Sequence, residues 1–374
     1  MTRLKLGMVG GGQGAFIGGV HRMAARLDGC YDLVAGAFAS DPARAHASAV
    51  ELGVCAERSY ADYREMAKAE AAREDGIDVV SIVTPNHLHG PIAEAFLKED
   101  IHVICDKPMT ATLEQAQSLL EATKASKAAF FLTHNYTGYP MIRQAQQMIV
   151  EGALGDIRIV EANYLQDWLS EAHAPDNKGA VWRTDPAQSG GGAIGDIGTH
   201  AYNLVCFVTG LKPTSLCATL HSHVAGRMVD DDARVTMHFK EGARGHIWAS
   251  QVAVGNENNL TLAVYGTQGS IRWSQENPNQ LWVTQLGAAP QLYTRGGGSS
   301  YPSAAMVTRI PAGHPEGYLE AFATLYREAA ETIATPADGL HKGTTIGVEQ
   351  GLDGVRFVDA CQRSSNAQSA WVTL

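Results

Sequence analysis

Residues 4–15, LKLGMVGGGQGA, decide the fold that we predict for this chain. The apolar run Leu4–Val9 has the composition of a buried strand, and a helical pattern follows the glycines. Gly10, Gly12 and Ala15 fit the spacing G-x-G-x-x-G/A between that strand and that helix. Glycine is needed there because a side chain would keep a pyrophosphate away from the N–H groups at the helix N-terminus. The stretch therefore predicts a dinucleotide-binding turn, with a plain tight turn as the alternative.

Strand and helix patterns alternate from this turn as far as residue 133. The predicted strands are 32–38, 78–83, 101–105 and 128–133, and the predicted helices are 42–53, 92–97 and 112–125. This alternation predicts a parallel, doubly wound sheet, whose ligands bind beyond the carboxyl ends of the strands. Ser40, Thr84–His87 and Asp106-Lys107 lie at those ends. We therefore expect them near the cofactor.

The residues after the second strand bear on the choice of cofactor. An acidic residue that binds the ribose hydroxyls is usual at the end of that strand, and Phe38 stands there instead. Asp41 follows shortly and would repel the 2′-phosphate of NADP, so the sequence favours NAD over NADP. Ser40 and Asp41 are equally suited to capping the next helix, which is the alternative interpretation.

The pattern changes after Asn135, where crossover helices between strands disappear. Seven segments alternate like strands: 156–165, 214–221, 233–239, 245–252, 260–265, 270–274 and 280–285. Their spacing predicts a largely antiparallel sheet. We expect the amphipathic segments 201–208, 317–333 and 345–364 to cover this sheet, and residues 287–313, rich in Gly, Ser and Pro, to form a loop. The predicted architecture is an α/β Rossmann domain at 1–135 and an α+β domain with a large open sheet at 136–374.

The composition narrows the classes of function. The 374 residues are 45% hydrophobic and 18% charged, which is ordinary for a globular protein. The net charge of −10, without any Lys/Arg run, argues against nucleic acid and anionic membranes as partners. No apolar stretch approaches the ~20 residues of a membrane span. The strand pattern begins too early to leave room for a signal peptide, so we expect a cytoplasmic protein.

The cysteines and histidines predict neither disulfides nor a metal. The six cysteines form no Cys-x-x-Cys pair, and most lie in apolar segments such as Ile101–Cys105. Reduced, buried thiols in a cytosolic protein are the simple interpretation. The 14 histidines are scattered without the spacing of metal ligands.

The stretch GGGAIGDIGTH at 190–200 carries the clearest candidate for chemistry. It predicts a flexible glycine hinge that runs into a helix with Asp196 and His200 four residues apart, on one helical face. A carboxylate that orients an imidazole makes a general base suited to neutral pH. A satisfied helix pair is the alternative. Lys107, directly after a predicted strand, is a second candidate, with a surface lysine in a turn as its alternative.

With these motifs the chain resembles the glucose–fructose oxidoreductase, inositol dehydrogenase and rhizopine catabolism family (Gfo/Idh/MocA). The resemblance covers essentially the whole chain and is carried by VGGGQGA at 9–15, TPNHLH at 84–89, CDKP at 105–108, WRTDP at 182–186 and the stretch at 190–200. The family more often has Glu-Lys-Pro where this chain has Asp106-Lys107-Pro108. THNYTGYP at 133–140 and GHPEGY at 313–318 resemble a sugar and cyclic-polyol branch that includes inositol, aldose and levoglucosan dehydrogenases.

The resemblance implies an NAD(P)-dependent oxidoreductase, frequently a dimer or tetramer joined through the open sheet. We expect a homotetramer or dimer. Lys107, Asp196 and His200 match the family's catalytic lysine, aspartate and histidine. His200 would act as general base and Asp196 would orient it, while the Lys107 ammonium would stabilise the developing alkoxide. We expect these three side chains to converge beside the nicotinamide.

Further residues are expected at the two ligands. The expected cofactor-binding residues are Gly10, Gly12, Gln13, Ala15, Ser40, Asp41, Thr84, Asn86, His89, Asp106, Lys107 and Asn135. The expected substrate-binding residues are Lys107, Tyr136, Gln166, Trp168, Arg183, Asp196, His200 and His314. Alternatives stay open for some of them. Tyr and Trp are also core residues, and Asn is also a turn residue. Arg183 could brace its loop through Asp185, and His314 could serve as a helix cap.

The predicted function is NAD-dependent oxidation of a ring secondary hydroxyl of a cyclic polyol or pyranose sugar. Scyllo- or myo-inositol or a glucose-like sugar would give a ketone or lactone. One alternative is an NAD-dependent glycosidase that acts by transient oxidation and elimination. A levoglucosan-type anhydrosugar dehydrogenase and a non-catalytic sugar-sensing protein are the others, although a sensor has no need of proton-transfer residues.

Overall fold

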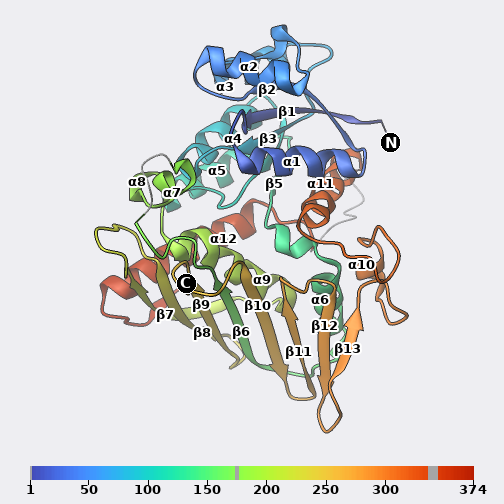
Figure 1. The fold of residues 1–374 in the computed structure, drawn as a ribbon, viewed down its shortest axis with the longest axis vertical. Coiled ribbons are helices and arrows are strands. Elements are labelled where there is room, and N and C mark those ends of the chain that lie inside the picture. Colours follow the sequence, from blue (N-terminus) through green and yellow to red (C-terminus); the bar gives the residue numbers. More distant parts are fainter. Residues whose placement is uncertain (1, 173–176, 336–343) are drawn as a thin grey trace. The chain divides into compact units, whose positions relative to one another are not determined.

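The computed structural model describes residues 2–172, 177–335 and 344–374, which belong to two compact units (Figure 1). Met1–Asn135 and Phe322–Leu352 make up the N-terminal unit. Tyr136–Ala321 and Asp353–Leu374 make up the C-terminal unit. The chain therefore passes between the units more than once.

The N-terminal unit contains the predicted doubly wound sheet. Its five parallel strands lie in the order β2 (Tyr31–Ala37), β1 (Leu4–Gly10), β3 (Val79–Val83), β4 (His102–Cys105) and β5 (Phe130–Leu132). The central strand β3 is buried at every residue, as expected for a parallel strand covered on both faces. The helices between the strands are α1 (Phe16–Leu27), α2 (Pro42–Leu52), α3 (Tyr63–Ala71), α4 (His89–Leu97) and α5 (Leu113–Ala125). The Rossmann prediction is confirmed, although α3 was not predicted.

Helix α11 (Tyr318–Ala334) corrects one expectation. We expected this segment to cover the antiparallel sheet, but from Phe322 onward it belongs to the N-terminal unit. There the Tyr326 hydroxyl lies 2.8 Å from Nδ1 of His21 and 2.7 Å from Oγ of Ser81. An amphipathic pattern predicts that one face of a helix will be buried, but it does not say against which surface.

The C-terminal unit contains the predicted open sheet, with nine strands in the order β13-β12-β11-β10-β6-β9-β8-β7-β14. The strands are β6 (Ile157–Leu165), β7 (Pro213–His221), β8 (Asp232–Phe239), β9 (Arg244–Ser250), β10 (Asn259–Gly266), β11 (Gly269–Ser274), β12 (Gln280–Gln285), β13 (Gln291–Thr294) and β14 (Val372–Thr373). Every pair is antiparallel except β6 with β9. The mostly antiparallel prediction is confirmed.

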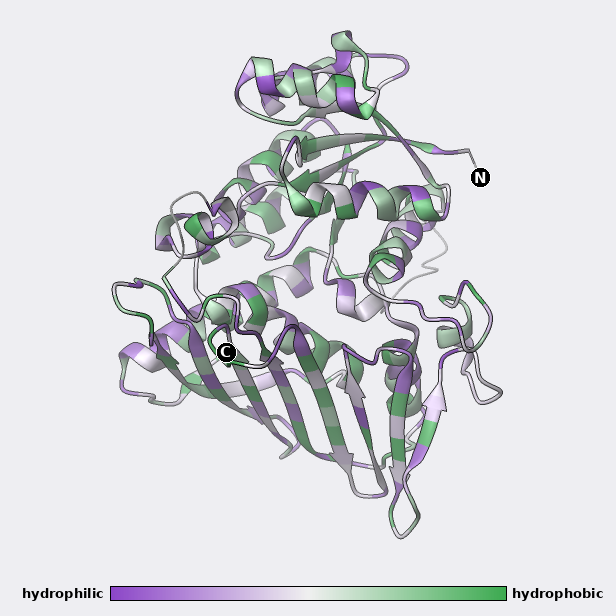
Figure 2. Cartoon of the chain, in the orientation of Figure 1, coloured by the Kyte–Doolittle hydropathy of each residue, from purple (hydrophilic) through white to green (hydrophobic). Residues whose placement is uncertain are grey.

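One face of this sheet is covered and the other is open. Burial alternates along β8 and β10, and bands of opposite hydropathy cross the strands in Figure 2. Helices α6 (Pro140–Val150) and α9 (Thr199–Thr209) pack against the covered face. The remaining helices that belong wholly or partly to the C-terminal unit are α7 (Lys178–Arg183), α8 (Pro186–Ser189), α10 (Pro302–Ala305) and α12 (Val348–Asn366).

The segment 287–313 is a second correction, because it is not a loop throughout. It contributes the edge strand β13, which pairs with β12 from Gln291 to Thr294, and the short helix α10. Three of the four residues of β13 are exposed, so the strand lacks the apolar alternation from which a strand is predicted. Within the described ranges, no helix has both the length and the apolar character needed to cross a bilayer.

Candidate active site

The glycine-rich turn forms a cradle that backbone alone can line. Gly10 has a φ of +81°, and a Cβ on Gly12 would lie 2.8 Å from the carbonyl oxygen of Phe38. Ala15 is the N-cap of α1, whose first turn carries no acidic residue. A hollow of about 310 Å³ opens beside this turn. Backbone N–H groups, a positive helix end and space without side chains suit a dinucleotide pyrophosphate.

Side chains from neighbouring helices complete this cradle. The backbone N–H of Gln13 donates to Oγ of Ser48 (3.1 Å), and its side chain donates to Glu51 (2.9 Å). Arg22 lines the same hollow and donates to the carbonyl oxygen of Gly11 (2.6 Å). Arg22 and Ser48 were not predicted. The only sequence signal for Arg22 is a basic residue two turns into the helix that follows the glycines.

Asp41 has the capping role that we considered as an alternative. Its Oδ1 accepts a hydrogen bond of 2.8 Å from the backbone N–H of Arg44 and starts α2. Ser40 and Asp41 are both exposed. The cap uses one carboxylate oxygen and leaves the negative charge on the surface.

His89 holds together two of the loops predicted to face the cofactor. Its ring is buried, with Nε2 2.8 Å from the carbonyl oxygen of Thr84 and Nδ1 2.7 Å from that of Pro108. Burial lowers the pKa of His89, against the effect of these two acceptors. Asn86, from the same motif, is buried as well. Both ring nitrogens of His89 thus face backbone, beside Lys107.

Asp106 is an ionised carboxylate next to the candidate lysine. Its Oδ1 accepts a hydrogen bond from the Thr133 hydroxyl (3.0 Å) and lies 3.6 Å from Nε2 of His21. Burial opposes ionisation, but His21 and Lys107 outweigh it and lower the pKa of Asp106 to about 2. A fixed negative charge therefore adjoins Lys107, which is partly exposed at the end of β4.

His134 and Asn135 extend this loop. Burial, with the Lys107 charge, lowers the pKa of His134 to about 3, so its imidazole is neutral near pH 7. Asn135 is buried, and across the described ranges nothing accepts a hydrogen bond from its Nδ2. An orphan buried amide donor is costly, and it suits a ligand acceptor such as a carboxamide or ribose oxygen. These features of the N-terminal unit fit the dinucleotide that the sequence predicts.

In the C-terminal unit, Asp196 and His200 lie on consecutive helical segments. Ile194–Gly198 is a π-helical turn that continues directly into α9. Oδ2 of Asp196 accepts from Nε2 of Gln251 (2.9 Å) and lies 3.2 Å from Nε of Arg183. Such π-turns are often found at functional sites. The flexible glycine hinge that we expected before this turn stays a prediction, and Asp230 accepts hydrogen bonds from the N–H groups of Gly192, Ala193 and Ile194 at its end.

Arg183 and Asp185 have separate partners. The Arg183 guanidinium pairs with Asp196 and lies over the Trp182 ring at 4.3 Å. Asp185 accepts from the N–H of Ala187 and from the Gln188 side chain, and so caps α8. Arg183 thus contacts a predicted catalytic residue.

An aromatic and amide network lies beside His200 and contains all three residues predicted for a sugar pocket. The Tyr136 ring packs edge-on against the His200 ring at 4.8 Å. The chain of hydrogen bonds runs from Tyr136 to Tyr164 (2.5 Å), Tyr164 to Asn258 (2.8 Å), Gln166 to Asn258 (2.8 Å) and Trp168 to Gln166 (3.0 Å). Tyr164 and Asn258 were not predicted. A Tyr on a strand and an Asn before one carry no distinguishing pattern.

His314 lies apart from this network. Its side chain is exposed, and its backbone oxygen accepts from the buried Arg295, which also pairs with Glu316 (3.0 Å). Its substrate contact stays a prediction. Across the described parts of the chain, no three acidic, histidine or cysteine side chains gather as metal ligands would.

The two units define a class: a Rossmann dinucleotide fold followed by an open-sheet domain with an acid and a histidine on one helix. Family models agree. Residues 4–146 match the oxidoreductase family with an NAD-binding Rossmann fold, and residues 142–272 match the Gfo/Idh/MocA C-terminal domain. The chain belongs to the Gfo/Idh/MocA oxidoreductase family, and its cofactor is NAD. The resemblance noted in the sequence is confirmed.

Individual relatives match most or all of the chain. A solved oxidoreductase from Sinorhizobium meliloti is 51% identical, with a TM-score of 0.91 and all of both chains covered. An inositol dehydrogenase homologue from Azotobacter vinelandii, solved with NADH and myo-inositol, is 36% identical (TM-score 0.92; 100% of this chain and 98% of that one). A levoglucosan dehydrogenase from Pseudarthrobacter phenanthrenivorans is 29% identical over 76% of each chain.

Proposed function

We propose that this enzyme oxidises a ring secondary hydroxyl of a cyclic polyol or pyranose sugar to a ketone or lactone. The observation that carries the proposal is the network of Tyr136, Tyr164, Asn258, Gln166 and Trp168 beside His200. Aromatic rings suit the apolar face of a sugar ring, and amides and hydroxyls suit its hydroxyl groups. The relatives that bind myo-inositol or are named for levoglucosan support the same substrate class.

We assign to His200, Asp196 and Lys107 the removal of the hydroxyl proton and the stabilisation of the substrate oxygen. When bound, NAD supplies the acceptor for the hydride that leaves the ring carbon. His200 takes the proton from the hydroxyl, and Asp196, held by Gln251 and Arg183, orients the imidazole and stabilises its charged form. The Lys107 ammonium donates to the substrate oxygen and stabilises its developing negative charge.

The remaining predicted residues keep their roles as part of this proposal. We assign cofactor binding to the domain at 1–135 and substrate binding and oligomerisation to the domain at 136–374. The residues assigned to NAD are Gly10, Gly12, Gln13, Ala15, Ser40, Asp41, Thr84, Asn86, His89, Asp106, Lys107 and Asn135. Those assigned to substrate are Lys107, Tyr136, Gln166, Trp168, Arg183, Asp196, His200 and His314. For His89, the two carbonyl contacts favour a supporting role.

The test is a substrate panel of inositols, hexoses and levoglucosan with NAD or NADP, followed by absorbance of the reduced nicotinamide. Turnover of a polyol or pyranose supports the proposal. If levoglucosan is the one panel compound that is turned over, the proposed substrate class changes to anhydrosugars. Glycoside cleavage without net reduction of NAD would replace the proposal with the glycosidase mechanism.

His200→Ala tests the general base on the substrate that the panel identifies. It should lower kcat about 10²–10⁴-fold and leave the Kd for NADH nearly unchanged. Lys107→Met should also lower kcat. If both residues act on one hydroxyl, the double variant should lose less than the product of the two single losses. Unchanged turnover in His200→Ala would end its assignment as the base.

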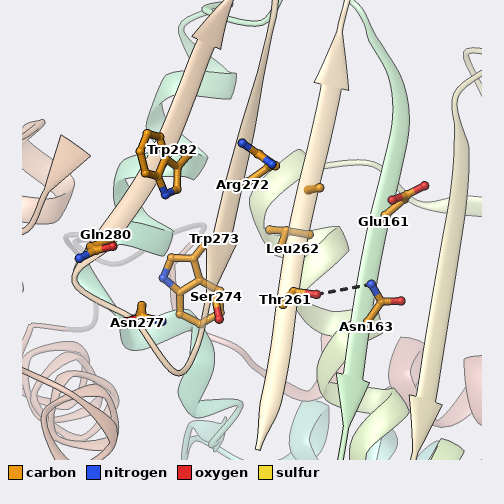
Figure 3. Close-up of a pocket in the computed structure, with 11 residues that line it drawn as sticks. Glu161, Asn163, Thr261, Leu262, Arg272, Trp273, Ser274, Asn277, Gln280 and Trp282 are labelled. Carbon is orange, nitrogen blue, oxygen red and sulfur yellow. Dashed lines mark hydrogen bonds between the residues drawn. The ribbon is translucent and has the colours of Figure 1, made fainter. Parts of the chain in front are cut away.

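We also propose a homo-oligomer, dimer or tetramer, joined through the open face of the nine-stranded sheet. A hollow of about 370 Å³ on this unit lies over β6 and β10–β12, with Glu161, Arg272 and Trp282 around it (Figure 3). Trp282 and Ile159 are both 41% exposed, more than large apolar side chains usually are. Light scattering on the purified protein should give a multiple of 39.9 kDa. The proposed compartment is the cytoplasm, since all six cysteines are free thiols.

A further inference from the structure

Asp230 lies at the end of the loop between β7 and β8 and makes three contacts with one distant segment. Its Oδ1 accepts from the N–H of Gly192 (3.0 Å), and its Oδ2 accepts from the N–H of Ile194 (2.8 Å). Its backbone oxygen accepts from the N–H of Ala193 (2.8 Å). Three consecutive amides are therefore satisfied by a single residue.

These amides begin the helical segment that carries Asp196 and His200. The first N–H groups of a helix have no partner within it and usually receive one from a capping side chain. Here the N-cap position is Ala193, and no side chain caps the helix locally. Asp230, which lies just before β8 and far from this helix in the sequence, supplies the capping carboxylate that no local side chain provides.

The glycines of the stretch at 190–200 permit this approach. A Cβ on Gly192 would lie 1.8 Å from the backbone oxygen of Asp230 and 2.8 Å from its nitrogen. Glycine at 192 is therefore required by the close passage of two backbones. The end of this glycine run lies close enough to Asp230 for the three hydrogen bonds at residues 192–194, which we call the tether.

The residue next to Asp230 anchors the catalytic acid from a second direction. The backbone oxygen of Asp231 accepts from the N–H of Gln251 (2.8 Å), and the Gln251 side chain donates to Asp196 (2.9 Å). The end of the loop thus fixes both the start of the helix and the partner of its carboxylate.

We propose that Asp230 is a positioning residue, which fixes the first turn of the catalytic helix and so aims Asp196 and His200. The inference rests on the proposed function for what those two residues do. Small displacements of a general base reduce turnover strongly, because proton transfer needs hydrogen-bond reach. Asp230 acts through the helix and is assigned no contact with substrate or NAD.

The chain offers a matched control in Asp231. Its carboxylate also accepts from two backbone amides, those of His223 (2.8 Å) and Val224 (3.0 Å), and it pairs with Arg227 (3.1 Å). Asp231 is fully buried, whereas Asp230 is partly exposed. Loss of the Asp231 carboxylate should therefore cost at least as much stability, but its side chain does not hold the helix.

The experiment compares Asp230→Ala, Asp230→Asn and Asp231→Asn for kcat, Kd for NADH and urea unfolding. Asp230→Ala should lower kcat about 10²-fold, and Asp230→Asn, which keeps one acceptor oxygen, should lower it less. Both should retain the Kd for NADH. Asp231→Asn, which keeps its backbone contact with Gln251, should lose stability and should lower kcat much less than Asp230→Ala does. Equal losses of kcat in Asp230→Ala and Asp231→Asn, or none in Asp230→Ala, would overturn the inference.

A second measurement separates this inference from the proposed function. If the wild-type protein turns over none of the panel substrates, the proposed function fails, but amide hydrogen exchange still tests the tether. Exchange at residues 192 and 194, whose N–H groups donate to the Asp230 carboxylate, should accelerate at least about tenfold in Asp230→Ala and not in Asp231→Asn. Unchanged exchange at these amides in Asp230→Ala would refute the tether whatever the substrate. Gly192→Ala, which forces the backbones apart, should reproduce the kcat loss if Asp230→Ala does not fold.

Discussion

The charges of the groups near Lys107 are set by burial and by neighbouring charges. Asp106 beside it is ionised, with a pKa of about 2, and His134 is neutral, with a pKa of about 3. His89 fixes the carbonyl of the next residue, Pro108. The lysine thus has one anionic neighbour, Asp106, and the His134 imidazole near it adds no competing positive charge.

His134→Gln tests the neutral imidazole through stability. An unfolded histidine titrates near 6.5, so the unfolded state binds the extra proton first as pH falls, and stability is lost on the acid side. Between pH 6.5 and 5.0 this one residue should cost up to about 2 kcal/mol. Urea unfolding should show that the acid-side loss is smaller in His134→Gln by that amount. Parallel pH curves for the two proteins would contradict the assignment.

Asp41→Ser tests the proposed preference for NAD over NADP. Serine retains the cap of α2, so the helix should keep its start while the negative charge is removed. The ratio of kcat/KM for NADP to that for NAD should rise about tenfold, equivalent to ~1.4 kcal/mol. An unchanged ratio at equal stability would show that Asp41 serves only as a cap.

At the scale of elements, α1 must pack close to the glycine turn that it follows. A Cβ on Gly18 would lie 2.4 Å from Cα of Gly11, whereas one on Gly19 would meet nothing nearer than the Arg22 side chain at 4.0 Å. Two adjacent glycines of one helix therefore have opposite roles. The first permits the cradle, and the second only weakens the helix.

Gly18→Ala and Gly19→Ala should separate these roles. Gly18→Ala should push the turn away, cost about 1–3 kcal/mol of stability and weaken NADH binding at least tenfold. Gly19→Ala should gain up to about 1 kcal/mol from helix propensity and keep the Kd for NADH. Fluorescence titration and thermal unfolding measure both. Equal behaviour of the two variants would mean that helix packing does not shape the cradle.

Elements with strong local patterns could be predicted from the sequence, and those defined by distant contacts could not. The period of two along β8 and β10, and the glycine spacing before α1, are local and gave correct elements. The unit against which α11 packs is decided by contacts with residues far away in the sequence, and the helical pattern does not contain this information. Asp230 lies far along the chain from the amides that it caps, so no spacing rule connects them. Tyr164 and Asn258 enter the site only because the sheet places them beside Tyr136.

Across the whole molecule, the pH dependence of stability is a sum of opposed contributions. Burial raises the pKa of Asp230 to about 6, above its usual 3.8, so the folded state binds this proton first as pH falls. The residue therefore adds stability as pH falls through 6, and this contribution is lost as pH rises. His134 has the opposite effect on stability over an overlapping pH range, because its pKa is lowered in the folded state.

Asp230→Asn tests the contribution of Asp230 to the pH dependence of stability. Removing the group that gains a proton on folding should make the loss of stability between pH 7.5 and 5.0 steeper than in the wild type, by about 1 kcal/mol. His134→Gln should make the same loss shallower. Urea unfolding at the two pH values gives both slopes, and the wild-type slope should lie between them. Slopes that move in the same direction would contradict the two assignments.

The placement of Tyr326 has a consequence for how the polypeptide matures on the ribosome. The Tyr326 hydroxyl beside His21 and Ser81 comes from a segment that is synthesised long after the Rossmann strands. A fragment that ends at residue 135 would lack the Tyr326 hydroxyl beside these two groups and would expose the apolar surface that Phe322 and Tyr326 cover, at a cost in free energy. Completion of the first unit must therefore await the emergence of α11, and a fragment that ends at residue 135 should be a poor stand-alone module.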